Sequence, residues 1–168
     1  MLKRVFDGIE GNTGLLVALS LLIFSMAILT TVVLPYFATN HYQPTALAVQ
    51  YTAQQQRGRQ LYAQSGCWEC HSQNVRLPES SIGTIHQAGD IGAVSHPGDY
   101  VYQNPTFFGQ HRRGPDLMHV ATRWPSEEWM MIHFLNPERL NPGTWMPSFG
   151  YLSEENLDAL SAYLMTLK

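Results

Sequence analysis

A run of twenty uncharged, mostly apolar residues near the N-terminus limits what this chain can fold into more than any other feature. Residues 15–34 read LLVALSLLIFSMAILTTVVL. As an α-helix this run is roughly 30 Å long, which is the thickness of the hydrocarbon core of a bilayer. The apolar region of a cleaved signal peptide is usually shorter, about 7–15 residues, and ends in a small-x-small site. The sequence therefore predicts a transmembrane helix.

The charges on either side of this run predict its orientation. Lys3 and Arg4 precede it, and no basic residue follows it until Arg57. An excess of positive charge marks the cytoplasmic side of a membrane span. We therefore expect a single-pass protein of the inner (cytoplasmic) membrane, with the N-terminus in the cytoplasm and the rest of the chain in the periplasm or another extracytoplasmic space.

The part of the chain after the span has the size of one ordinary domain. The segment NHYQPTALAVQYTAQQQ, residues 40–56, is polar, uncharged and broken by Pro44, as is typical of a linker. We expect a cytoplasmic N-terminus over residues 1–14, a transmembrane helix over 15–36, a linker over 37–52 and a folded domain over 53–168. From residue 41 onward eight Lys and Arg face eleven Asp and Glu with no basic cluster, so nothing indicates a nucleic-acid partner.

Both cysteines of the chain lie in the motif CWECH, as Cys67 and Cys70, with His71 directly behind them. An exported domain can keep a disulfide, which leaves a structural or catalytic bridge as one alternative. A thioredoxin-like dithiol belongs in a βαβ setting, however, and a zinc site would need a fourth ligand at ordinary spacing. Cys-x-x-Cys-His is the attachment signature of c-type haem, in which the cysteines form thioethers and the histidine binds the iron. The sequence favours one covalent haem c held at Cys67, Cys70 and His71.

A haem that only transfers electrons usually has both axial positions filled, and a methionine opposite the histidine raises its potential. Met146 lies in NPGTWMPSF, between Pro142 and Pro147, where a helix is excluded and a stiff loop can hold a sulfur over the ring. The other methionines lie outside the domain or where packing is the default role: Met1, Met26, Met118, Met130, Met131 and Met165. We therefore predict that Met146 is the second axial ligand.

Two helices are expected to flank these ligands. Ser153 can cap a helix over residues 153–167, whose leucines at 157, 160, 164 and 167 share one face. Before the cysteines, RGRQLYAQSG places Gly58 and Tyr62 on one face of another helix, where a glycine allows close approach. We expect Gly58 to contact the last helix near Tyr163. The order of helix, haem motif, loops, methionine loop and helix is that of a small all-α cytochrome.

The layout resembles that of class I cytochromes c, whose helix-crossing positions Gly58, Tyr62 and Tyr163 match. In that fold the proline of GPDL, here Pro115, offers its carbonyl to the second nitrogen of the haem histidine. More closely, the chain resembles the mono-haem subunit (subunit II) of cbb3-type cytochrome c oxidases. The stretches that carry this resemblance are YTAQQQRGRQLYAQSGCWECHSQ, YVYQNPTFFGQHRRGPDL and NPERLNPGTWMPSFGYL. The implied fold is all-α, with one N-terminal transmembrane helix followed by a class I cytochrome c domain.

The resemblance also implies a function and partners. The chain would be an electron-transfer subunit that is not itself catalytic, passing electrons through one His/Met-ligated haem. The partners implied are a polytopic, haem-b-containing oxidase catalytic subunit and either another cytochrome c subunit or a soluble donor. The equivalent haem c subunit of a nitric oxide reductase is the alternative complex. An anchored haem sensor with an open iron site is the alternative from another functional class.

Overall fold

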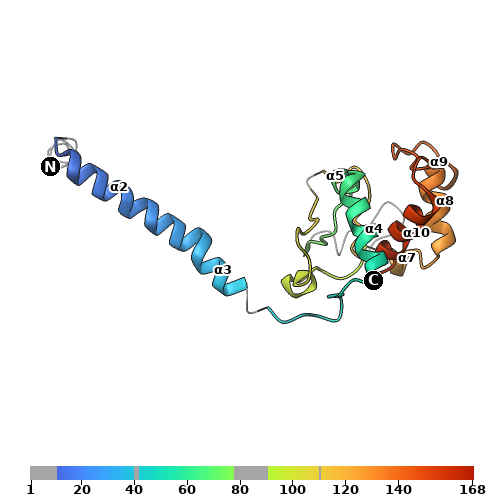
Figure 1. Cartoon of the computed structure of the whole chain (residues 1–168), viewed down its shortest axis with the longest axis horizontal. Coiled ribbons are helices and arrows are strands. Elements are labelled where there is room, and N and C mark those ends of the chain that lie inside the picture. Colours follow the sequence, from blue (N-terminus) through green and yellow to red (C-terminus); the bar gives the residue numbers. More distant parts are fainter. Residues whose placement is uncertain (1–10, 40–41, 78–90, 110) are drawn as a thin grey trace. The chain divides into compact units, whose positions relative to one another are not determined.

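The structure is a computed structural model that describes residues 11–39, 42–77, 91–109 and 111–168. The chain divides into two units, Met1–Gln43 and Pro44–Lys168, and each is described by itself. Every regular element within the described residues is helical, and none of those residues forms a strand (Figure 1). The all-α fold class with one apolar N-terminal helix is therefore confirmed.

Residues 13–39 of the first unit form one long helix built from three consecutive segments. These are α2 (Thr13–Ile28), the π-helix η1 (Leu29–Val33) and α3 (Leu34–Thr39). The side chain of Asn12 caps α2 by accepting a hydrogen bond from the Leu15 N–H at 3.1 Å. Thr13–Ala38 covers 26 residues with a mean hydropathy of 2.5, so by length and composition it can cross a membrane. This helix fits a single-pass anchor.

The π-helical turn lies just before Pro35. Pro35 has no N–H, so the Thr31 carbonyl, four residues before it, lacks its usual α-helical donor. Within the turn, the Leu34 N–H bonds to the Leu29 carbonyl, five residues earlier, which makes the turn wider than an α-helical one. The hydroxyl of Thr31 donates to the Ala27 carbonyl at 2.7 Å, and that of Thr30 donates to the Met26 carbonyl at 2.9 Å. Both hydroxyls are thus satisfied within the helix.

The second unit contains the remaining helices. They are α4 (Ala53–Gln64), α5 (Cys67–Cys70), the 3₁₀-helix η2 (Pro97–Tyr100), α7 (Val120–Arg123), α8 (Glu127–Leu135), α9 (Pro137–Leu140) and α10 (Glu154–Leu164). Ser126 and Ser153 cap α8 and α10 by accepting bonds from the N–H groups of Trp129 and Asn156, and acidic residues occupy the first turn of both helices. The cap at Ser153 is the one that the sequence predicted.

Helices α4 and α10 cross at Gly58, and this contact confirms the predicted crossing. A Cβ added to Gly58 would lie 1.8 Å from the carbonyl oxygen of Ala159 and 2.9 Å from the Cβ of Tyr163. Such distances leave room for hydrogen only, so a residue without a side chain is required. Tyr62 and Tyr163 meet edge to face beside the crossing, with ring centroids 5.6 Å apart.

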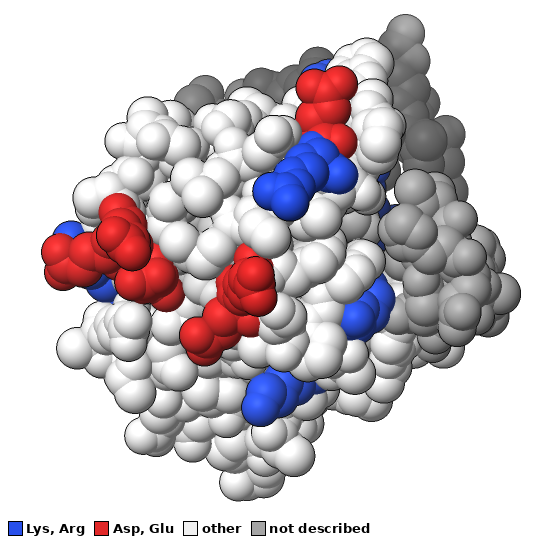
Figure 2. Space-filling view, turned by 90° about the vertical axis from the view of Figure 1, so that its right-hand side faces the viewer, with Lys and Arg blue, Asp and Glu red and all other residues white. Residues whose placement is uncertain are grey.

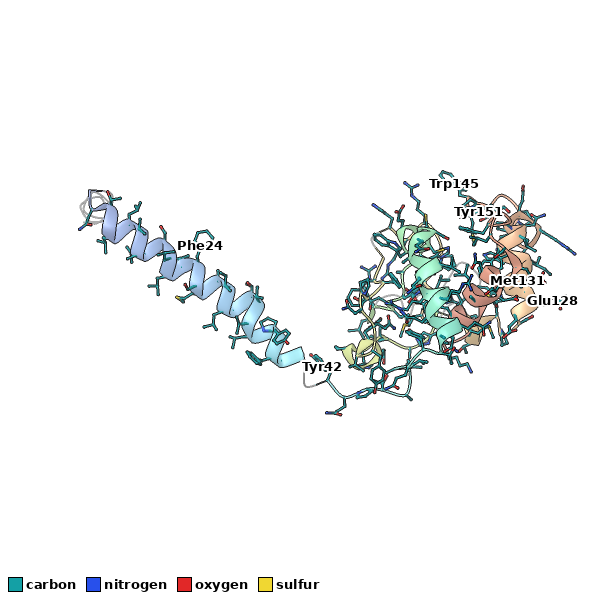
Figure 3. All side chains as sticks on the ribbon, in the orientation of Figure 1. Phe24, Tyr42, Glu128, Met131, Trp145 and Tyr151 are labelled. Carbon is teal, nitrogen blue, oxygen red and sulfur yellow. The ribbon has the colours of Figure 1, made fainter. Side chains whose placement is uncertain are left out.

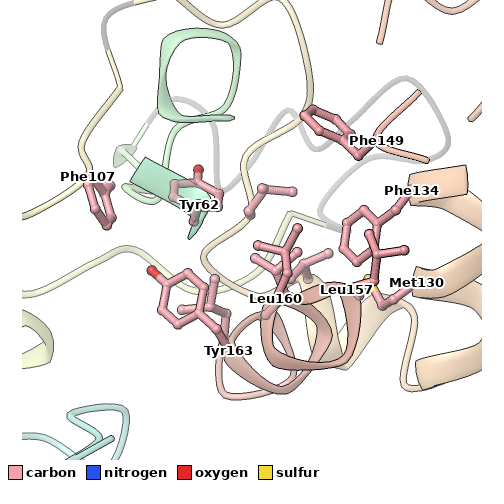
Figure 4. Close-up of a cluster of buried hydrophobic side chains, with 12 residues drawn as sticks. Tyr62, Phe107, Met130, Phe134, Phe149, Leu157, Leu160 and Tyr163 are labelled. Atoms are coloured by element: carbon pink, nitrogen blue, oxygen red, sulfur yellow. The ribbon is translucent and has the colours of Figure 1, made fainter. Parts of the chain in front are cut away.

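The main core lies around this crossing (Figure 4). The predicted leucine face of the last helix is buried in it. The cluster comprises Tyr62, Phe107, Leu117, Val120, Met130, Phe134, Phe149, Leu157, Leu160, Tyr163, Leu164 and Leu167. A second, smaller cluster consists of Val75, Ile91, Tyr100 and Met118. Residues 91–109, from the long segment between His71 and Gly114, thus contribute to both cores.

Residues 44–51, from the segment that the sequence assigns to a linker, pack against the second unit. Thr45 donates its hydroxyl to the Asp99 carboxylate at 2.5 Å, and its N–H bonds to the Gly98 carbonyl at 3.3 Å. Leu47 packs on the smaller core cluster, and Tyr51 meets the ring of Tyr163 edge to face. The chain is therefore held on the domain from residue 45 onward.

The Gly58 crossing generates a stability prediction. Gly58→Ala should lower the free energy of unfolding by about 1–3 kcal/mol, because the added methyl overlaps the Ala159 carbonyl and forces the two helices apart. Denaturant unfolding of the full chain in detergent, followed by circular dichroism, measures the change. Gln60→Ala, at an exposed position of α4, is the control and should have little effect. A Gly58→Ala chain as stable as wild type would contradict the crossing.

Candidate functional site

The two cysteines lie on one helical turn that follows α4 almost directly. Gly66 adopts a left-handed backbone conformation with φ of +71°, which allows the chain to leave α4 and begin α5 at Cys67. Cys67 is partly buried against the main core, whereas Cys70 is exposed. Because residues three apart on a helix share a face, both thiols are presented on the same side of this turn.

The thiol chemistry argues against a redox role. Both cysteines are free, and burial raises the pKa of the Cys67 thiol to about 12. A catalytic dithiol needs the opposite, a thiol pKa lowered toward neutrality. Within the described ranges, no group of three or more His, Cys, Asp or Glu side chains is placed to hold a metal ion, so a zinc site at the cysteines finds no further ligands there.

His71 ends the cysteine helix with its imidazole oriented by a single hydrogen bond. The backbone N–H of His71 donates to the Cys67 carbonyl at 2.9 Å, and the backbone of His71 is extended. The Nδ1–H donates to the Pro115 carbonyl at 2.8 Å, which leaves the lone pair on Nε2. Burial lowers the pKa of His71, although the Pro115 bond and the Asp116 carboxylate act in the other direction. A neutral imidazole with Nε2 available is the form that binds a metal.

The segment that holds the imidazole packs tightly on the motif. The Gly114 N–H bonds to the Cys70 carbonyl at 3.0 Å. A Cβ added to Gly114 would lie 2.3 Å from Cε1 of His71, so only glycine allows the backbone this close to the ring. The structure thus brings together Cys67, Cys70, His71 and Pro115, which the sequence had placed at one site.

The buried carboxylate of Asp116 ties the same segment to the residues after the motif. It accepts hydrogen bonds from the Ser72 hydroxyl at 2.5 Å, the Asn74 N–H at 2.9 Å and the Met118 N–H at 2.8 Å. Asp116 is only 3% exposed. Its backbone carbonyl also accepts a bond from the Arg123 guanidinium. Nothing in the sequence singles out Asp116, because an aspartate in a loop is usually a solvated turn residue.

Met146 lies in the loop between α9 and α10, partly buried against the main core. Its N–H bonds to the Thr144 hydroxyl at 3.2 Å. Two further bonds fix the loop to the end of α8: the Ser148 hydroxyl donates to the Leu135 carbonyl at 2.7 Å, and the Phe149 N–H donates to the Phe134 carbonyl at 2.8 Å. This methionine therefore sits in a pinned, non-helical loop, as the two prolines predicted.

The other methionines of the domain have packing roles in the structure. Met118 belongs to the smaller core cluster and Met130 to the main one, each 3% exposed or less. Met131 and Met165 are partly buried and pack against the main cluster from their helices. Met146 and Cys67 pack against that same cluster, which brings the methionine loop and the haem motif to one core.

His133 on α8 is a candidate site residue that the sequence did not reveal. Its Nδ1 is buried and has no hydrogen-bond partner, and its ring stacks on Trp129 with centroids 4.7 Å apart. Burial lowers the pKa of His133 to about 4, and the nearby His71 adds to this effect. A lone histidine in a helix carries no sequence signal for a ligand. An unmade hydrogen bond in an apolar setting beside His71 suits a bound group with a polar edge.

These observations test whether the residues fit a haem. Two free thiols stand on one turn, an imidazole keeps its outer nitrogen available, and an orphaned polar atom lies nearby on α8. An apolar core cluster supports both the cysteines and the methionine loop. The donor set and its surroundings fit a haem attached at Cys67 and Cys70.

Comparison with known proteins agrees with this chemistry. A family model described as cytochrome C oxidase, mono-heme subunit/FixO, matches residues 7–166. No curated protein sequence matches the chain. The family match covers the apolar N-terminal helix as well as the domain with the cysteine motif.

The packing of Gly114 on His71 yields a prediction. Gly114→Ala should displace the imidazole, because the added methyl overlaps the ring, and should lower the free energy of unfolding by about 1–3 kcal/mol. Haem content per chain and the optical spectrum of the purified full chain report the change at His71, the expected iron ligand. Gly150→Ala is the control, since its methyl would meet only ordinary contacts. Equal haem content and spectra in the two variants would contradict the assigned contact.

Proposed function

The chain belongs to the family of cbb3-type cytochrome c oxidase mono-haem subunits, and on this basis we propose that it relays single electrons through one covalent haem c to the catalytic subunit of the oxidase. The resemblance read from the sequence is confirmed by the family match. The observation that carries the proposal is the bond between His71 and Pro115, which leaves Nε2 of the imidazole free to bind iron.

Each residue of the proposed site has a separate task. Cys67 and Cys70 would hold the cofactor by thioethers, so that it could not dissociate, and His71 would bind its iron. Met146, from the loop ahead of α10 that is held by hydrogen bonds, would provide the second ligand. An iron held by both residues would offer no open position to a substrate, which supports electron transfer rather than catalysis.

When bound, the haem supplies a one-electron couple between ferric and ferrous iron. The chain's contribution is to keep the ligands still while the charge changes. The Pro115 bond fixes the orientation of the imidazole, and the bonds from Ser148 and Phe149 to α8 fix the methionine loop. Main-core side chains exclude water from the buried side of the site.

The apolar N-terminal helix supports a membrane-anchored subunit rather than a diffusing carrier, because Thr13–Ala38 is long and apolar enough to cross a membrane. Lys3 and Arg4 precede this helix, and an excess of positive charge marks the cytoplasmic side of a span. We propose that the N-terminus lies in the cytoplasm and the haem domain on the extracytoplasmic side of the inner membrane.

The surface beside the methionine loop offers a contact for the proposed partner. Trp145, next to Met146, is 89% exposed, and Tyr151 is also exposed (Figure 3). Exposed aromatic side chains are typical anchors of protein interfaces. Elsewhere, acidic and basic side chains are intermixed on the face seen in Figure 2. These features suit docking of the methionine side to a membrane-bound oxidase subunit through apolar contact.

The equivalent subunit of a nitric oxide reductase remains the alternative complex, and the relay mechanism would be the same there. The open-site sensor is less well supported, because Met146 lies in a loop held by several hydrogen bonds. The family match favours the cbb3-type oxidase over both.

Covalent attachment is the first expected outcome. The purified full chain should retain its haem through acid-acetone extraction, and its mass should exceed that of the polypeptide by one haem. Cys67→Ala combined with Cys70→Ala should release the cofactor entirely. A wild-type chain of polypeptide mass, or one that loses its haem to acid acetone, would refute the proposal.

Met146→Leu is expected to abolish the methionine-sulfur charge-transfer band and to lower the reduction potential. Leucine conserves the volume of methionine, so packing changes little and the loss of the sulfur dominates. Met131→Leu, on the same core cluster, is the matched control and should retain both properties. If Met131→Leu loses the band while Met146→Leu keeps it, the assignment of the ligand is wrong.

The identity of the complex has its own test. After mild detergent extraction, the full chain should co-elute on gel filtration with a large subunit that contains haem b and reduces oxygen. A partner that reduces nitric oxide instead would leave the relay intact and change the complex. A stable, solitary cytochrome of monomer mass would overturn the proposed partnership.

A further inference from the structure

We propose that Asp116 is a positioning residue whose buried carboxylate braces the His71–Pro115 contact and holds down the reduction potential of the iron, in opposition to the guanidinium of Arg123. This inference rests on the proposed haem relay and adds to it the charges that tune it. The resemblance and the family match assign no role to either residue.

The bracing follows from where the carboxylate is bonded. Ser72 and Asn74 lie one and three residues after His71. The Ser72 hydroxyl and the Asn74 N–H both donate to the Asp116 carboxylate. Asp116 itself follows Pro115, and the next residue, Leu117, donates its N–H to the Ser72 carbonyl at 2.7 Å. The residues after His71 and the residues after Pro115 are therefore joined at several points. These hydrogen bonds keep the Pro115 carbonyl within hydrogen-bond distance of Nδ1 of His71.

The electrostatic role follows from burial and hydrogen bonding. The carboxylate accepts hydrogen bonds from three donors, the Ser72 hydroxyl and the N–H groups of Asn74 and Met118. Because Asp116 is buried, water screens its charge poorly, and the charge acts over longer distances than a surface charge does. Ser72 is adjacent to His71 in the chain, Asp116 is adjacent to Pro115, and Arg123 donates to the Asp116 backbone carbonyl, so both charged residues are tied to the segments that hold this imidazole.

The charges of Asp116 and Arg123 would also act on the iron that His71 would hold. Oxidation from ferrous to ferric adds one positive charge at the metal. A nearby anion stabilises the more positive ferric state and so lowers the reduction potential, and a nearby cation raises it. Asp116 and Arg123 therefore oppose each other. Arg123 donates to the backbone carbonyl of Asp116, which fixes the spacing between the two charges.

A redox titration of full-length variants tests this role. Asp116→Asn preserves the size of the side chain and removes its charge. It should raise the potential by an amount equivalent to about tenfold in the equilibrium constant for reduction, which is 59 mV for one electron. Arg123→Met should shift the potential in the opposite direction. In both variants, covalent haem and the methionine-sulfur band should remain.

The control is another buried aspartate of the same domain. Asp99 is 2% exposed and accepts bonds from the Thr45 hydroxyl and the His96 N–H, which lie outside the cysteine motif and the Gly114–Asp116 segment. Asp99→Asn should therefore leave the equilibrium constant for reduction within about twofold of the wild-type value. A shift as large as that of Asp116→Asn would show that any buried aspartate has this effect, and would overturn the inference.

The outcomes separate this inference from the function on which it rests. A wild-type chain without covalent haem refutes the relay itself. Haem-loaded Asp116→Asn with an unchanged potential refutes the electrostatic role alone. If both variants lower the potential and lose the sulfur band, the residues have only a structural role. If Asp116→Asn yields no haem-loaded chain, Arg123→Met decides the question. A fall of at least about threefold in the equilibrium constant for reduction, with the methionine-sulfur band retained, supports the opposition of charges. An unchanged potential overturns it.

Discussion

The close crossing of α4 and α10 at Gly58 is the constraint on which the rest of the domain depends. The cysteine motif follows α4 directly, and the methionine loop precedes α10, so the crossing determines where both enter the site. The Ala159 carbonyl occupies the place of a side chain at Gly58, which lets the two backbones touch. Tyr62 and Tyr163 extend the contact into the main core. Apolar packing thus brings the cysteine motif and the methionine loop, which are far apart in sequence, to one core.

A second layer of order is polar and lies on the other side of His71. Pro115 orients the imidazole, Gly114 gives the backbone access to the ring, and Asp116 joins this segment to the residues after the motif. Buried polar groups are costly unless their hydrogen bonds are made, so a satisfied network of this kind fixes one arrangement. The core determines where the site lies, and the polar network determines how its histidine points.

This division suits a protein that moves electrons without moving atoms. The charge on a metal changes at each transfer, and ligands that shifted with it would slow the exchange. The Asp116 carboxylate is buried and held by three hydrogen bonds, so its position is already set before any charge changes at the site, as in preorganised sites.

Sequence alone determined the features that depend on local chemistry. The apolar run predicted a helix long enough to cross a membrane, the cysteine spacing indicated a haem motif, the prolines around Met146 excluded a helix there, and Gly58 indicated a close crossing. Only the tertiary structure revealed the hydrogen bonds of Asp116, the unpartnered Nδ1 of His133 and the packing of residues 44–51 on the domain. The physical reason is that a carboxylate, a lone histidine or a polar segment acquires its role from partners distant in sequence, and burial decides whether its charge or its missing hydrogen bond matters. The spacing of residues along the chain indicates neither these distant partners nor the burial of the side chain.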